Sequence, residues 1–66
     1  MNVLSMIFRQ SRADEEIRGE IWRLGVRHSG YPLGGALEEL REPDVSMTRA
    51  VLLRACVDRL RKTQAA

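Results

Sequence analysis

The 66-residue sequence has one cysteine, one histidine and one lysine. A single cysteine, Cys56, cannot form a disulfide within the chain, and one histidine, His28, leaves no His/Cys cluster that could hold a structural metal. A domain of this length buries only about 60% of the surface that its unfolded chain exposes. With these two supports excluded, oligomerisation or binding to a partner is the expected source of additional stability.

Long apolar runs are also missing. Nothing in the sequence approaches the ~20 consecutive apolar residues of a membrane span. The first eight residues, Met1 to Phe8, are largely apolar, but they have no charged region before them and no small-residue cleavage site after them. We therefore expect a soluble cytoplasmic protein with no membrane partner, and an unpaired cysteine agrees with a reducing compartment.

Catalytic motifs are absent as well. The sequence contains no Gly-rich phosphate loop, no H-E-x-x-H and no nucleophile elbow, and its carboxylates lie in clusters typical of solvated helix faces. Eleven basic and nine acidic residues are interspersed along the chain and give a net charge of +2, which is weak evidence for binding to nucleic acid. We expect a protein that is not an enzyme and uses no cofactor, metal or small-molecule substrate.

The strongest positive feature is the stretch from Ala50 to Val57, in which seven of eight residues are apolar. On a helix, its apolar positions other than Val51, together with Leu60, cover an arc of roughly 220°, about twice what one packing face needs. This predicts a helix over 46–62 that is covered from more than one side. Ser46 is the expected N-cap, and residues 63–66 are expected to fray.

Two further helices precede this stretch, which gives an all-α fold of three helices at about 12–27, 32–41 and 46–62 in one domain. Ser11 is the predicted N-cap of the first helix, followed by acidic residues in its first turn. Its predicted inner face is Ala13, Ile17, Ile21 and Leu24. Its predicted solvent-side ion pairs are Asp14 with Arg18 and Glu20 with Arg23.

The connection between the first two helices contains Gly30, which can take the left-handed conformation that ends a helix. Pro32 suits the first turn of the second helix. Gly34 and Gly35 each weaken that helix by roughly 1 kcal/mol relative to alanine. Either they allow close packing of the backbone against a neighbour, or they are tolerated at the surface.

The N-terminal segment, residues 1–10, fits two structures. As a strand it alternates its apolar residues between two sides, whereas as a short helix it brings Val3 and Leu4 over Ile7 and Phe8 at the i, i+4 spacing. Periodicity leaves both open.

Trp22 and Val26 do not fit the inner face of the first helix, because they point 140° to 180° away from Ile17. Either the N-terminal segment or the edge of the core covers them, or another chain does. The expected function is a small helical module for protein binding or self-association, such as a homodimer with a regulatory role. The predicted partner interface comprises Trp22, Val26, Leu52, Cys56 and Leu60. Cys56 is expected to be an inert thiol of the core, and His28 to stabilise the C-terminal end of the first helix.

The alternative function is dimeric binding to DNA. The segment from Val3 to Leu40, with an N-terminal strand and Gly30-Tyr31-Pro32-Leu33 as its turn, resembles the ribbon-helix-helix repressors, in which paired strands enter the major groove. The stretch from Val45 to Val51 resembles the start of a helix-turn-helix recognition helix. These resemblances imply contacts to DNA from Arg9, Ser46, Thr48 and Arg49.

Overall fold

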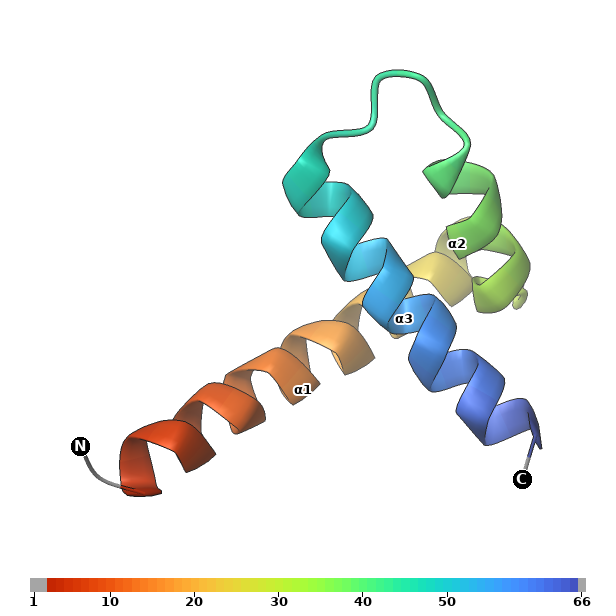
Figure 1. Ribbon diagram of the computed structural model, residues 1–66. Helices are drawn as coiled ribbons and strands as arrows, with labels where there is room; N and C mark the ends of the chain where they lie inside the picture. The colour runs from red at the N-terminus through yellow and green to blue at the C-terminus, as the bar shows by residue number, and fades with distance from the viewer. Residues whose placement is uncertain (1–2, 66) are drawn as a thin grey trace.

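The computed structural model describes residues 3–65, with side chains described for residues 13–63. It consists of three helices, α1 (Val3–Arg27), α2 (Pro32–Leu40) and α3 (Met47–Ala65) (Figure 1). Residues 3–65 contain no strand. The predicted all-α, three-helix fold is therefore confirmed. None of the helices in this range is long and apolar enough to cross a bilayer.

The first helix begins much earlier than predicted. Residues 3–10 are helical and continue into α1 without a break, so the strand alternative is wrong and the segment is not a separate short helix. Ser11 lies inside α1 and is not its N-cap. The physical reason is that no proline or glycine interrupts the sequence between Val3 and Arg18, so nothing stops a helix that has already formed.

The end of α1 uses two residues of positive φ. Gly30 has φ +88°, as predicted, and Ser29 also has a positive φ of 57°. The Gly30 N–H donates to the carbonyl of Gly25 at 2.7 Å, which is the long-range bond of a Schellman motif. Pro32 then opens α2, where its missing N–H costs nothing.

The third helix begins where the sequence predicts. The Arg49 N–H donates to Ser46 Oγ at 3.1 Å, and the Ala50 N–H donates to the Ser46 carbonyl at 2.8 Å. Ser46 is therefore the N-cap of α3. The helix continues to Ala65, through residues that we expected to fray.

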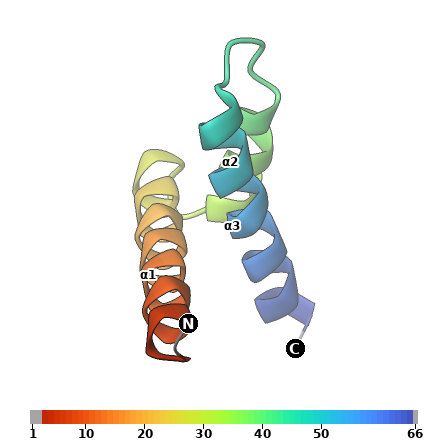
Figure 2. The ribbon, with the colours of Figure 1, turned by 60° about the vertical axis from the view of Figure 1, so that its left-hand side comes forward.

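The core lies where α3 meets both other helices. Among the described side chains, five apolar residues are buried: Leu24, Ala36, Leu53, Cys56 and Val57. Figure 2 shows α1 on one side of the pair formed by α2 and α3. This packing agrees with the prediction that the apolar stretch of α3 is central and is covered from more than one side.

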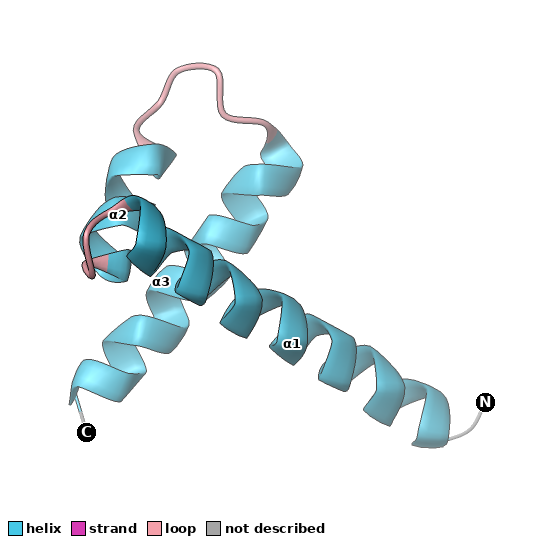
Figure 3. Ribbon diagram, turned by 180° about the vertical axis from the view of Figure 1, so that it is seen from behind, coloured by secondary structure: helices cyan, strands magenta, loops and turns pink. Residues whose placement is uncertain are grey.

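One part of α1 lies outside this packing. The N-terminal half of the helix projects beyond the body formed by α2 and α3, as Figures 1 and 3 show from opposite sides. Among the described side chains, Asp14 of α1 contacts α3, because its Oδ1 lies 2.7 Å from Arg59 Nη2.

Candidate functional site

A buried carboxylate joins α1 to α3. The Glu20 side chain is only 3% exposed. It accepts hydrogen bonds from Arg23 Nε at 3.1 Å, from Arg27 Nη2 at 2.9 Å and from Arg49. Arg23 and Arg27 belong to the same helix, whereas Arg49 comes from the first turn of α3. The predicted pair of Glu20 with Arg23 exists, but its placement on the solvent side is wrong, because Arg49 covers Glu20 from the opposite helix.

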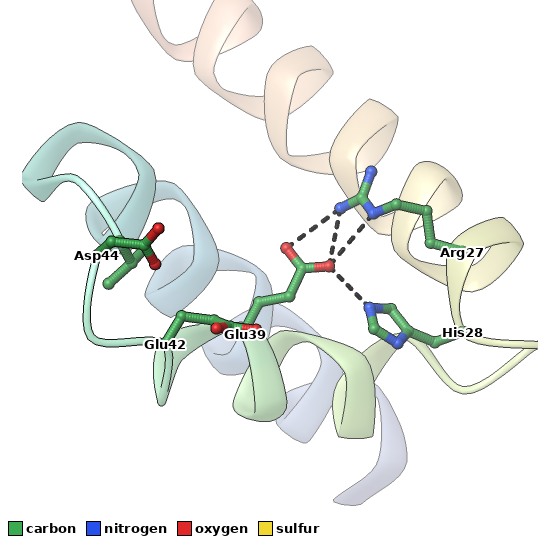
Figure 4. Close-up of a pocket in the computed structure, with 6 residues that line it drawn as sticks. Arg27, His28, Glu39, Glu42 and Asp44 are labelled. Atoms are coloured by element: carbon green, nitrogen blue, oxygen red, sulfur yellow. Dashed lines mark hydrogen bonds and ion pairs between the residues drawn. The ribbon is translucent and has the colours of Figure 1, made fainter.

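A second carboxylate, Glu39 of α2, extends the cluster to all three helices. It accepts hydrogen bonds from Arg49 Nη2 at 2.9 Å and from Arg27 Nε at 3.2 Å. Its Oε2 also lies 2.7 Å from His28 Nε2, as Figure 4 shows. An ionised carboxylate only accepts, so His28 carries its proton on Nε2. We call Glu20, Glu39, Arg27, Arg49 and His28 the ionic cluster.

The ionic cluster holds both carboxylates in their charged form. The hydrogen bond from Arg49, with those from Arg27 and Arg23, outweighs burial and lowers the pKa of Glu20 to about 2. Burial raises the pKa of Glu39, but hydrogen bonds from His28, Arg49 and Arg27 outweigh it and lower the pKa to about 2. Neither carboxylate changes protonation near neutral pH, where a general acid or base would have to work. The cluster is suited to fixing the helices relative to one another.

His28 also explains one of the two glycines of α2. A Cβ on Gly35 would overlap the imidazole ring of His28, whereas a Cβ on Gly34 would meet nothing within 4 Å. Both interpretations offered by the sequence therefore apply, one to each glycine. Gly35 permits close packing, and Gly34 is tolerated at an open position.

An open hollow of about 530 Å³ lies beside the ionic cluster, lined by Arg27, His28, Glu39, Glu42, Asp44 and Val45. The hydrogen-bond donors on its wall, Arg27 and His28, are already hydrogen-bonded to Glu39 (Figure 4). They have little capacity left for an anionic ligand. The cluster is thus better explained as structural than as a binding site.

The second candidate site is the outer face of α1. Trp22 is 69% exposed and Val26 is 64% exposed, so the described part of the chain does not cover them. The other predicted interface residues lie elsewhere. Leu52 and Leu60 are partly buried, and Cys56 is completely buried.

Cys56 therefore offers no surface to a partner, and its assignment to an interface is wrong. Burial raises the pKa of its thiol, and Sγ lies 3.8 Å from the carbonyl oxygen of Ile17. This agrees with the inert core thiol that the apolar arc predicts. The sequence did not single out Met47 and Val51, two further exposed apolar residues on α3.

The molecule has an unusually large surface for its mass. Its accessible surface is 5337 Å², whereas a compact monomer of 7.5 kDa exposes about 4,200 Å². Its radius of gyration is 13.2 Å, against about 11 Å for a compact domain of this length. The surplus of about 1,100 Å² is comparable to the ~800 Å² that one partner loses in a standard protein interface.

The residues predicted to contact DNA have other surroundings. Ser46 caps α3, and the guanidinium of Arg49 is bound by Glu20 and Glu39. Thr48 is exposed, and the side chain of Arg9 lies outside the described residues. The ribbon-helix-helix resemblance also loses its strand, because residues 3–10 are helical.

Comparison with protein-family models, with curated proteins and with solved structures found no match to this chain.

Proposed function

We propose that this chain is a small, non-enzymatic interaction module that self-associates as a homodimer through the outer face of α1. The observation that carries the proposal is the exposure of Trp22, at 69%, next to Val26, which is 64% exposed. Tryptophan is among the residues most enriched at the energetic centre of protein interfaces. A soluble domain gains nothing from leaving so large an apolar side chain in water.

The size of the core supports the same proposal. Five buried apolar residues in the described part are few for an independent domain, and a chain of this length usually needs an additional source of stability. Association supplies it by removing apolar surface from water. Covering the exposed part of Trp22 alone is worth roughly 4 kcal/mol at 25 cal/mol per Å².

The proposed module acts in the cytoplasm, where the reducing environment keeps Cys56 as a thiol. The proposed module requires no cofactor, membrane or small-molecule substrate. The nearly balanced charge of the chain favours a protein partner over nucleic acid as the second molecule.

The test is sedimentation equilibrium of three proteins over a range of concentrations. Replacing Trp22 by alanine should raise the dimer dissociation constant on the order of 1,000-fold, because each of the two copies loses an interface tryptophan that contributes about 2 kcal/mol or more. The matched control is Tyr31→Ala, which removes an aromatic side chain that is 73% exposed but lies outside α1.

The wild type and Tyr31→Ala should associate equally, and Trp22→Ala should be largely monomeric. Equal association of all three proteins would contradict the proposal. So would retention of the protein on duplex DNA that weakens as salt rises, because this is the signature of phosphate contacts.

A further inference from the structure

A single stripe of α1 links the projecting half of the helix to Trp22. The stripe has seven positions, and each lies four or three residues after the one before it, in steps of 4, 3, 4, 3, 4 and 4. The seven positions are Leu4, Phe8, Ser11, Glu15, Arg18, Trp22 and Val26. This is the spacing of the seam along which two helices pack in a coiled coil. Leu4 and Phe8 precede Trp22 and Val26 by 18 residues, which is about five full turns.

The stripe is apolar at its ends and charged in the middle. At one end, Trp22 and Val26 are exposed by 69% and 64%. In the middle, Glu15 is exposed, and the Arg18 side chain is 67% exposed. At the other end, residues 4–8 lie in the part of α1 that projects away from the body (Figure 3).

From this arrangement we infer that the occupant of the Trp22–Val26 face is the projecting N-terminal segment of a second copy of this chain, with the two α1 helices antiparallel. The inference rests on the proposed self-association and adds to it the occupant and the orientation. A two-fold axis midway between Glu15 and Arg18 brings each Glu15 beside the Arg18 of the second copy. The same axis sets residues 4–8 of each copy alongside the C-terminal end of the other α1, from Gly25 onward, next to Trp22.

Charge selects this orientation. Antiparallel packing forms two oppositely charged pairs, whereas parallel packing would set Glu15 against Glu15 and Arg18 against Arg18, which is unfavourable. The two helix dipoles also oppose each other when the helices are antiparallel.

The open space beside Trp22 and the large accessible surface of the chain agree with the same antiparallel arrangement. A Cβ placed on Gly25 would meet nothing within 4 Å, so the seam beside Trp22 is open to a neighbouring helix. Because the interface is isologous, each copy contributes one projecting segment and one Trp22 face. The surplus surface of about 1,100 Å² per copy is enough to form an interface of standard size.

The orientation is tested by quenching of tryptophan fluorescence between copies. Trp22 is the only tryptophan, so a nitroxide-labelled copy that carries Trp22→Phe contributes no emission of its own. The label is attached through Arg12→Cys in one sample and through Ser29→Cys in another. Cys56 is fully buried and should remain unlabelled in the folded protein, which mass spectrometry of the labelled wild type checks.

Antiparallel packing sets residue 12 about 1.5 Å along the helix axis from the opposing Trp22. Residue 29 follows the C-terminal end of α1 and lies more than about 20 Å along the axis from that tryptophan. Parallel packing would give about 15 Å and about 10 Å instead. When labelled and unlabelled copies are mixed, the label at residue 12 should quench Trp22 strongly, and the label at residue 29 should quench it little.

A charge exchange provides a second readout. Glu15→Arg and Arg18→Glu should each raise the dimer dissociation constant about threefold to thirtyfold, because two exposed pairs become repulsive. The double variant with both changes should return close to the wild-type value. In a parallel dimer the directly facing charges stay alike in every variant, so each single change should weaken association much less.

The outcomes separate the two proposals. A wild-type protein that stays monomeric refutes the proposed function itself. A dimer that is quenched by the label at residue 29, or by neither label, leaves self-association standing and overturns the antiparallel arrangement.

Discussion

Replacing Glu20 by glutamine tests how much the ionic cluster contributes to stability. The variant keeps the shape of the side chain and removes the charge that binds Arg23, Arg27 and Arg49. Hydrogen bonds to a charged group contribute about 1.5–3 kcal/mol each, but the three arginines are partly exposed, and Arg27 and Arg49 retain Glu39. We therefore expect a loss of about 2–3 kcal/mol in the free energy of unfolding. A domain of this length has only about 3–10 kcal/mol in total.

The assay is urea denaturation followed by helical circular dichroism, at one fixed protein concentration because association adds to apparent stability. The matched control is Glu16→Gln, an exposed carboxylate on the same helix, which should change the free energy of unfolding by less than about 0.5 kcal/mol. The effect should also depend on pH. The folded-state pKa of Glu20 is about 2, below the ordinary 4.5. The contribution of Glu20 to the free energy of unfolding is therefore fully present above pH 4.5 and is lost as pH falls toward 2.

The difference between wild type and Glu20→Gln should consequently shrink as the solution is acidified and nearly vanish at the lowest pH. An unfolding midpoint for Glu20→Gln equal to that of the wild type at neutral pH would refute the role given to the cluster. A difference that stayed constant down to pH 2 would refute its electrostatic origin.

Three other predictions follow from the packing. Gly35→Ala should lower the free energy of unfolding by about 1–3 kcal/mol in urea denaturation, because the new Cβ displaces His28. Gly34→Ala should raise it by up to about 1 kcal/mol, and equal effects of the two variants would contradict the contact between Gly35 and His28. Ser29→Gly should raise the thermal midpoint, with a gain of about 1 kcal/mol, because glycine adopts a positive φ without strain, and an unchanged or lower midpoint would argue against that conformation. Cys56 should react with a thiol reagent only as fast as the protein opens, so its rate should rise with urea and not with pH alone; fast reaction in the native protein would place the thiol at the surface.

The sequence predicts the fold well where the signals are local. Ser46 as an N-cap, Gly30 at a positive φ and Pro32 at the start of α2 depend only on neighbouring residues, and all three are confirmed. The apolar arc of α3 likewise predicts a helix packed from two sides. The start of α1 was missed because Ser11 carries a plausible capping signal, and a capping side chain does not stop a helix that can continue.

The ionic cluster could not be predicted in the same way. The spacing of Glu20, Arg23 and Arg27 places them near one another on α1, but Arg49 lies 29 residues from Glu20 in the sequence. Which helix face Arg49 meets depends on how α3 crosses α1, and periodicity within one helix carries no information about that crossing. For the same reason the sequence predicts Arg49 only as a DNA contact of the alternative function, and Glu20 on the solvent side. The position of Trp22 off the inner face, by contrast, follows from its angle to Ile17 on a single helix. Its exposure does not, because the sequence leaves open whether the N-terminal segment folds back over it.

The most direct test of the central claim is the solution mass of the wild-type chain measured by sedimentation equilibrium beside Trp22→Ala. Self-association through α1 predicts twice the chain mass of 7.5 kDa for the wild type and a shift toward the single-chain mass for the variant. A single-chain mass for the wild type at every accessible concentration would contradict the claim, and so would an undiminished dimer of Trp22→Ala.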